Sequence, residues 1–211
     1  MGCHLVVLAC NTASAKALRT IQQNDLPRYD DVHKVLGVIR PTTESIGYYT
    51  QSRHIGILAT PGTVRSESYP IEIAKFFPDI TVYQQACPMW VPLVENNDLD
   101  SPGARYFVEK HIKQLLNQSA EIDTIVLACT HYPLLLPLIE EFVPPGIRIL
   151  TQGKTVATSL ADYLFRHPNI EVLCSKNSRI NFRTTEQASS FDDKASIFYG
   201  SPVRSESLLL K

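Results

Sequence analysis

Two short, wholly apolar segments constrain the fold of this chain more than any other feature. Residues 5–9 read LVVLA and are followed by CNT, while residues 125–128 read IVLA and are followed by CTH. An apolar run of this length that ends in small polar residues is typical of a parallel strand buried on both faces. The echo is too short to indicate a repeat array, but it predicts two similar α/β halves.

The rest of the chain alternates strand and helix signals. Strands are expected at residues 5–9, 35–39, 55–59, 81–85, 124–128, 147–150, 170–174 and 180–183. Helices are expected at about 13–23, 41–51, 102–115, from 133, 154–166 and 186–198. Thr63 is expected to cap the turn after the third strand, and the last dozen residues are expected to form a loose tail. This order predicts an α/β fold with mostly parallel sheets.

Composition narrows the classes of function. The chain has 211 residues, of which 44% are hydrophobic and 19% charged, with a net charge of -1. The sequence contains no block of Lys and Arg, so binding to nucleic acid is not favoured. No apolar run is long enough to cross a bilayer. The five cysteines include no CxxC pair, so neither a disulfide framework nor a zinc ribbon is indicated. We therefore expect a cytoplasmic protein with a small-molecule partner.

The two cysteines that follow the apolar segments suggest a specific chemistry. Cys10 and Cys129 each lie at the carboxyl end of a predicted strand, just before a helix start, where ligands bind in α/β sheets and thiolates are favoured. If the two predicted halves face each other, one thiol lies on each side of the cleft between them. One thiol then removes a proton from a carbon centre while the other delivers one, without metal or cofactor. Asn11, Thr12 and Thr130 are candidates to hold the substrate's carboxylate and ammonium groups.

Three other interpretations remain open at this point. A lone Cys at a strand end is more often a small core residue, although two in matched contexts weaken that interpretation. Cys129 and His131 have the residue types of metal ligands, but no third or fourth ligand has a recognisable spacing. A covalent Cys-His hydrolase would also use these two residues, and it leaves Cys10 without a role.

Five segments resemble the glutamate racemases of the cofactor-independent aspartate/glutamate racemase superfamily. They read LVVLACNTAS, GVIRP, IGILATPGTVRSESY, CPMWVPLVE and IVLACTHYPLL, and the resemblance covers essentially the whole chain in order. The paired cysteine segments are typical of the superfamily, and the other segments indicate the glutamate enzyme. The resemblance implies cofactor-free interconversion of L- and D-glutamate, supplying D-glutamate for peptidoglycan.

The resemblance also implies residue roles. Cys10 would be the base for D-glutamate and Cys129 the base for L-glutamate, with His131 as a proton-transfer partner. Glu95 matches an acidic residue of the family's site region. The implied substrate-binding residues are Asn11, Thr12, Thr60, Thr63 and Thr130.

Several departures from the family pattern lead to further expectations. Family members carry an earlier α/β segment with Phe-Asp-Ser-Gly and Pro-Tyr-Gly stretches, neither of which occurs here. We therefore expect an N-terminally truncated first half, with a catalytically impaired fragment as one alternative and a racemase of aspartate or another amino acid as a second. Arg40 stands where an acidic residue is usual, and TQGKT at 151–155 where an Asp-Ser stretch is common.

The expected domain division follows from this order of segments. The first half comprises residues 1–36 and 152–211, and the second half runs through 37–151, with the active-site cleft between them. The sequence leaves open whether the chain forms a homodimer.

Overall fold

The computed structural model describes residues 2–176 and 178–209. The chain forms two compact units, Met1–Cys174 and Ser175–Lys211. The expected α/β fold with parallel sheets is confirmed, because every strand pair in the described part of the chain is parallel. The division into halves expected from the sequence stays a prediction.

The elements of the structure alternate along the chain as follows. The strands are β1 (Leu5–Leu8), β2 (Lys34–Gly37), β3 (His54–Ala59), β4 (Thr81–Ala86), β5 (Thr124–Ala128), β6 (Arg148–Thr151), β7 (Phe182–Thr184) and β8 (Ser205–Ser207). The α-helices are α1 (Asn11–Thr20), α2 (Leu26–Tyr29), α3 (Ile39–Ser45), α4 (Pro61–Arg65), α5 (Ser68–Phe76), α6 (Trp90–Glu95), α7 (Pro102–Leu116), α8 (Leu136–Phe142), α9 (Gly153–Arg166), α10 (Pro168–Glu171) and α11 (Ala188–Tyr199). A π-helix, η1, spans Ile21–Asp25, and 3₁₀ helices η2 and η3 span Ile46–Tyr48 and Tyr132–Leu135.

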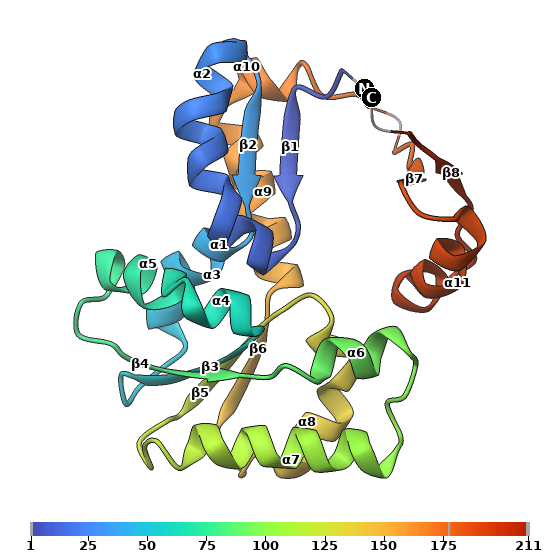
Figure 1. Ribbon diagram of the computed structural model, residues 1–211. Coiled ribbons are helices and arrows are strands. Elements are labelled where there is room, and N and C mark those ends of the chain that lie inside the picture. Colours follow the sequence, from blue (N-terminus) through green and yellow to red (C-terminus); the bar gives the residue numbers. More distant parts are fainter. Residues whose placement is uncertain (1, 177, 210–211) are drawn as a thin grey trace. The chain divides into compact units, whose positions relative to one another are not determined.

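The larger sheet of the first unit has the strand order β4-β3-β5-β6 and lies between two layers of helices (Figure 1). Its central strands β3 and β5 are buried on both faces, as their apolar sequences predict. Leu58 and Leu127, which are paired in register, pack into a core with α6, α7 and α8. Their neighbours Ile57 and Val126 point to the opposite face and pack with α3 and α5. The sheet therefore has two cores, one on each side.

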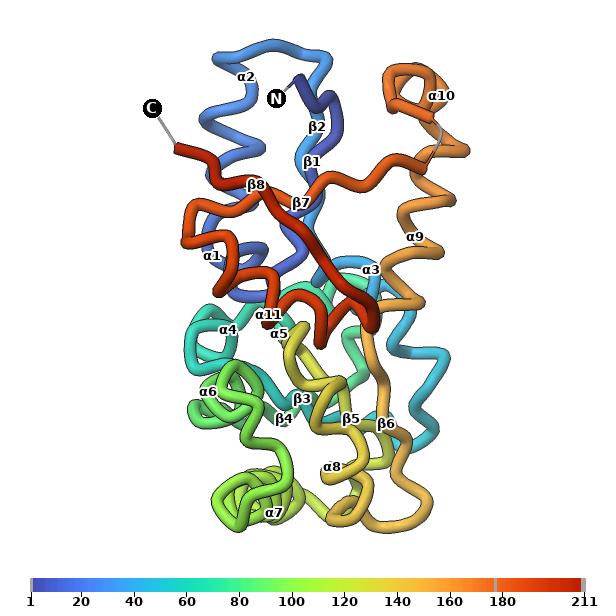
Figure 2. Tube along the Cα trace, turned by 90° about the vertical axis from the view of Figure 1, so that its right-hand side faces the viewer, coloured from blue at the N-terminus to red at the C-terminus, as the bar shows by residue number. Residues whose placement is uncertain are grey.

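The smaller sheet of this unit pairs β1 with β2, and α1 and α9 lie on its opposite faces (Figures 1 and 2). Helix α1 packs so tightly that a Cβ on Gly37 would come within 2.6 Å of Leu18 Cδ2 and 2.9 Å of Ser14 Oγ. The Ser14 hydroxyl donates to the Leu8 carbonyl (2.9 Å) and accepts from the Val38 N–H (3.2 Å). These contacts fix α1 against the carboxyl ends of both strands.

Three local expectations were wrong. Residues 170–174 were expected as a strand, but α10 begins at Pro168, where the fixed φ of proline suits a first helical turn, and the chain continues in turns. The last dozen residues were expected as a loose tail, yet β8 pairs with β7 in the second unit. Thr60, and not Thr63, caps α4, because its side chain accepts from the Thr63 N–H.

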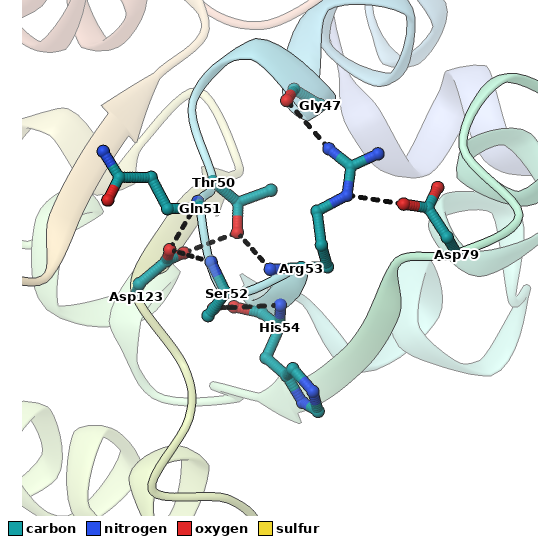
Figure 3. Close-up of polar contacts among 8 residues, drawn as sticks. All are labelled: Gly47, Thr50, Gln51, Ser52, Arg53, His54, Asp79 and Asp123. Carbon is teal, nitrogen blue, oxygen red and sulfur yellow. Dashed lines mark hydrogen bonds and ion pairs between the residues drawn. The ribbon is translucent and has the colours of Figure 1, made fainter.

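A hydrogen-bonded carboxylate sets the positions at which β3 and β5 begin (Figure 3). Asp123, directly before β5, accepts from the Thr50 hydroxyl (2.6 Å) and from the N–H groups of Gln51 and Ser52 (both 2.7 Å). The Thr124 hydroxyl also donates to Asp123 (2.9 Å). The turn before β3 is thereby fastened to the start of its neighbouring strand.

Candidate functional site

Residues with a thiol or a polar side chain follow the carboxyl ends of strands β1, β3, β5 and β6. Cys10 lies two residues beyond β1, and Thr60, Cys129 and Gln152 directly follow β3, β5 and β6. Ligands of open α/β sheets bind at these ends because the following loops and helix N-termini lie there. The candidate site is built from these residues and from the helices that start beside them.

Cys10 is the N-cap residue of α1. Its backbone is extended (φ -113°, ψ 128°), its carbonyl accepts the Ser14 N–H at 2.9 Å, and its side chain makes no capping hydrogen bond. The thiol belongs to an exposed residue. The first N–H groups of an α-helix have no partner within the helix and favour a nearby negative charge. The start of α1 therefore combines an accessible thiol with groups suited to a carboxylate.

Cys129 lies in a very different environment, since only 7% of the residue is exposed. Burial raises the pKa of its thiol to about 11, although hydrogen bonds from the backbone N–H groups of His131 and Tyr132 act in the opposite direction. Negative charge on Cys10 raises this pKa further. At neutral pH the Cys129 side chain is therefore a protonated thiol.

A carboxylate and an imidazole extend from Cys129. Its Sγ lies 3.8 Å from Nδ1 of His131, and Nε2 of the same ring lies 2.5 Å from Oε1 of Glu95, the last residue of α6. Both side chains are partly exposed. Glu95 precedes His131 by 36 residues in the sequence, and the fold brings it into one hydrogen-bonded line with His131 and Cys129 that is suited to proton transfer.

Three hydroxyl groups meet between the first turns of α1 and α4. Thr12 Oγ1 lies 2.8 Å from Thr60 Oγ1 and 3.2 Å from Thr63 Oγ1, and the last two oxygens are 3.1 Å apart. Each hydroxyl is both a donor and an acceptor, so the partly exposed Thr12 and Thr60 can turn their hydrogens toward a carboxylate, while the fully buried Thr63 supports them from behind. All three residues were predicted from the sequence to bind substrate.

Asn11 is directed into the interior and is only 2% exposed. Its Nδ2 donates to Gln152 Oε1 (2.6 Å), and its Oδ1 accepts from the Tyr69 hydroxyl (2.8 Å). Sequence reasoning missed Tyr69 and Gln152 as partners. Gln152 follows the carboxyl end of β6, so the strand-end rule that selected Cys129 would also have selected it, whereas Tyr69 carries no comparable signal.

Comparison with known proteins places this arrangement in a family. A sequence profile described as Asp/Glu/Hydantoin racemase matches residues 1–160. The chain belongs to this family. Glutamate racemase from Lactiplantibacillus plantarum is 37% identical over 199 residues, covering 94% of this chain and 70% of that protein. Glutamate racemase from Shouchella clausii is 35% identical over 90% of this chain and 66% of its own length.

The racemase fold is also found in solved structures. A glutamate racemase isoform from Bacillus anthracis superposes with a TM-score of 0.85 and 28% identity, covering 98% of this chain and 74% of that one. The enzyme from Francisella tularensis, in complex with D-glutamate, has a TM-score of 0.79 at 22% identity and supports the fold alone. The resemblance predicted from the sequence is thereby confirmed, and the chain spans about two thirds to three quarters of these relatives.

Three further observations concern Thr130, metal ligands and membrane-spanning helices. Thr130, predicted to bind substrate, is exposed directly after Cys129. Among the described residues, no group of three or more His, Cys, Asp or Glu side chains is arranged to hold a metal ion. None of the helices in the described part of the chain has the length and apolar composition that a membrane crossing requires. The roles of the individual site residues stay predictions.

Proposed function

We propose that this chain is a glutamate racemase that interconverts L- and D-glutamate and supplies D-glutamate for peptidoglycan. The carrying observation is the pair of cysteines at the carboxyl ends of β1 and β5, in a chain 37% identical to a glutamate racemase. Inversion at a carbon centre needs a base on one face and an acid on the other. Two thiols on opposite sides of a substrate meet that need without a cofactor.

The reaction proceeds by proton transfer between sulfur and carbon. The Cys129 thiolate removes the α-proton of L-glutamate, and the Cys10 thiol delivers its proton to the opposite face of the carbanion. D-glutamate leaves, and the two sulfurs have exchanged protonation states. The reverse reaction starts with Cys10 as thiolate and Cys129 as thiol. Burial raises the pKa of Cys129 to about 11, so in the free protein this sulfur is a thiol at neutral pH.

The neighbouring groups support binding and proton transfer. His131 lies beside Cys129 and assists its proton exchange, with Glu95 on the far side of the ring. The hydroxyl cluster of Thr12, Thr60 and Thr63 is suited to a substrate carboxylate. The free N–H groups at the start of α1 are a second carboxylate site, and Thr130 is accessible beside Cys129 as a further contact.

The decisive experiment follows the α-hydrogen. The purified chain is incubated with L-glutamate in D₂O, and deuterium at the α-carbon is measured by NMR while D-glutamate is measured by chiral chromatography. Because the delivered proton comes from the second thiol, early D-glutamate should carry deuterium while unreacted L-glutamate keeps hydrogen. EDTA should leave the rate unchanged. A folded chain that yields neither exchange nor D-glutamate would contradict the proposal.

Matched cysteine variants test the mechanism separately from the activity. Cys10→Ala and Cys129→Ala should each lower turnover by about 100-fold or more, the size of a general acid–base contribution. Cys3→Ala, which removes an exposed thiol elsewhere, is the control and should keep full activity. Full activity in either site variant would exclude the two-thiol mechanism. L-aspartate, tested in parallel, should turn over more slowly than L-glutamate.

A cytoplasmic location belongs to the same proposal. In the described part of the chain, all five cysteines carry free thiols, a state that a reducing compartment maintains. The mechanism requires two of them to stay reduced.

A further inference from the structure

A buried set of polar side chains ties the start of α1 to other elements of the first unit. Asn11 bonds to both Tyr69 of α5 and Gln152, the residue between β6 and α9. Gln152 Nε2 lies 2.7 Å from the Tyr69 hydroxyl oxygen, so the three side chains form a closed ring of hydrogen bonds. The same nitrogen lies 3.0 Å from Thr42 Oγ1 and 3.2 Å from the Val38 carbonyl oxygen.

We propose that Tyr69 and Gln152 are positioning residues for the Cys10 thiol. They act through Asn11, which directly follows Cys10, so the two Cα atoms are only about 3.8 Å apart. A side chain that anchors Asn11 therefore anchors the backbone of Cys10. The inference rests on the proposed racemisation, since Cys10 is one of its two thiols.

The anchor is rigid, whereas Cys10 itself is not held by its side chain. Tyr69 is fully buried in the core formed with α3 and β3. Asn11 and Gln152 are also buried, and a buried polar network in which the members satisfy one another specifies a single geometry. Cys10, by contrast, is exposed and makes no capping bond. The position of the Cys10 backbone, from which the thiol projects, is thus held through Asn11.

The network also joins the two parts of the site. Asn11 starts the helix that packs on the β1–β2 sheet, while Tyr69 packs on the four-stranded sheet that carries Cys129. Two-thiol catalysis depends on the distance between the sulfurs. A displacement of about 1 Å in a reacting group can cost about 100-fold in rate. Loss of a single bond in the ring should therefore reduce the rate although the substrate contacts are intact.

The test compares Tyr69→Phe and Gln152→Met with Thr43→Val. Each of the first two keeps the side-chain volume but removes hydrogen bonds of the ring. Thr43 is equally buried on α3, but its hydroxyl donates only to the Arg40 carbonyl of its own helix (3.0 Å), so T43V is a matched control. We expect kcat to fall about 10- to 100-fold in Y69F and Q152M, with KM changed less than about threefold. T43V should stay within about twofold of the parent chain in both constants.

A second measurement does not require turnover. The rate at which iodoacetamide alkylates Cys10 is followed by mass spectrometry of its peptide, in variants whose fold is verified by circular dichroism. Y69F and Q152M should alter this rate at least about threefold, while T43V leaves it unchanged. If the parent chain lacks racemase activity, the proposed function fails but this comparison still decides the positioning role.

Two outcomes would overturn the inference. Folded Y69F and Q152M with parental kcat and parental Cys10 alkylation would show that the ring is only structural; if Y69F does not fold, Q152M decides alone. The double variant is the other test. Because Tyr69 and Gln152 both act through Asn11, the loss of kcat in the double variant should match the larger of the two single losses within about twofold. A loss equal to the product of the two single losses would show that the two residues act independently and would contradict the inference.

Discussion

Oε1 of Glu95 lies 2.5 Å from Nε2 of His131. This contact orients the imidazole so that its other nitrogen, Nδ1, faces the sulfur of Cys129 at 3.8 Å. The carboxylate accepts a hydrogen bond from a protonated Nε2 and stabilises the ring when it carries positive charge. Glu95 thus fixes the orientation of the imidazole that lies beside the buried thiol.

Glu95→Gln should therefore slow the reaction without unfolding the chain. Glutamine has the same shape but no charge, so the imidazole loses its carboxylate hydrogen-bond acceptor. We expect kcat to fall about tenfold or more. Glu140→Gln, an exposed carboxylate on α8, is the control and should leave kcat unchanged. Steady-state kinetics by chiral chromatography provide the measurement, and an E95Q enzyme as fast as the E140Q enzyme would exclude this role.

The two thiols should differ in their reactivity with pH. Burial raises the pKa of Cys129 to about 11, so below that pH its thiolate fraction increases about tenfold per pH unit. Iodoacetamide should therefore modify exposed Cys10 first near pH 7, and modification of Cys129 should accelerate steeply between about pH 8 and 11. Mass spectrometry of the two cysteine peptides measures both rates. Equal rates at pH 7 would contradict the buried environment of Cys129.

The hydroxyl cluster can be tested at Thr60, which bonds to both other members. Thr60→Val keeps the shape but removes the bonds to Thr12 and Thr63 and the cap of α4. Loss of a hydrogen bond to a charged carboxylate costs about 1.5–3 kcal/mol, so KM for glutamate should rise about tenfold or more. Thr60→Ser retains the hydroxyl and should restore KM to within about threefold. An unchanged KM in T60V would place the carboxylate elsewhere.

Much of the fold could be predicted because the central strands carry the strongest local signals. Strands β3 and β5 are buried on both faces. Their apolar composition is typical of a strand in a parallel sheet that helices cover on both sides. The segment 170–174 has the same β-branched composition and was interpreted as a strand. Pro168 starts a short helix here, and the backbone N–H groups that follow it bond to carbonyls three or four residues earlier. In a segment this short, composition alone does not distinguish a strand from a helix.

The site was predictable to the extent that it follows strand ends. That rule, together with the family resemblance, selected Cys10, Thr60 and Cys129. It could not reveal the partners of Asn11, because a bond to Tyr69 joins residues 58 positions apart and depends on how two helices pack. The contact between Glu95 and His131 is likewise a consequence of tertiary packing, for which the sequence supplies only the residue types.

The hydrogen bonds to Asp123 should make the fold sensitive to acid. Burial alone would raise the pKa of this carboxyl, but bonds from the Ser52 N–H, the Thr50 hydroxyl and the Gln51 N–H outweigh it and lower the pKa to about 2 (Figure 3). A pKa below the unfolded value of 3.8 stabilises the fold above that pH, and the stabilisation disappears as the pH falls toward 2.

Asp123→Asn places an NH₂ group among these donors. Because Asp123 is only partly buried, the expected loss at pH 7 is about 1–2 kcal/mol, or roughly 2–8 °C in Tm. Thermal melts from pH 7 to pH 2 should show the difference between the two proteins shrinking below about pH 4, and a constant difference would mean that Asp123 does not titrate in this way.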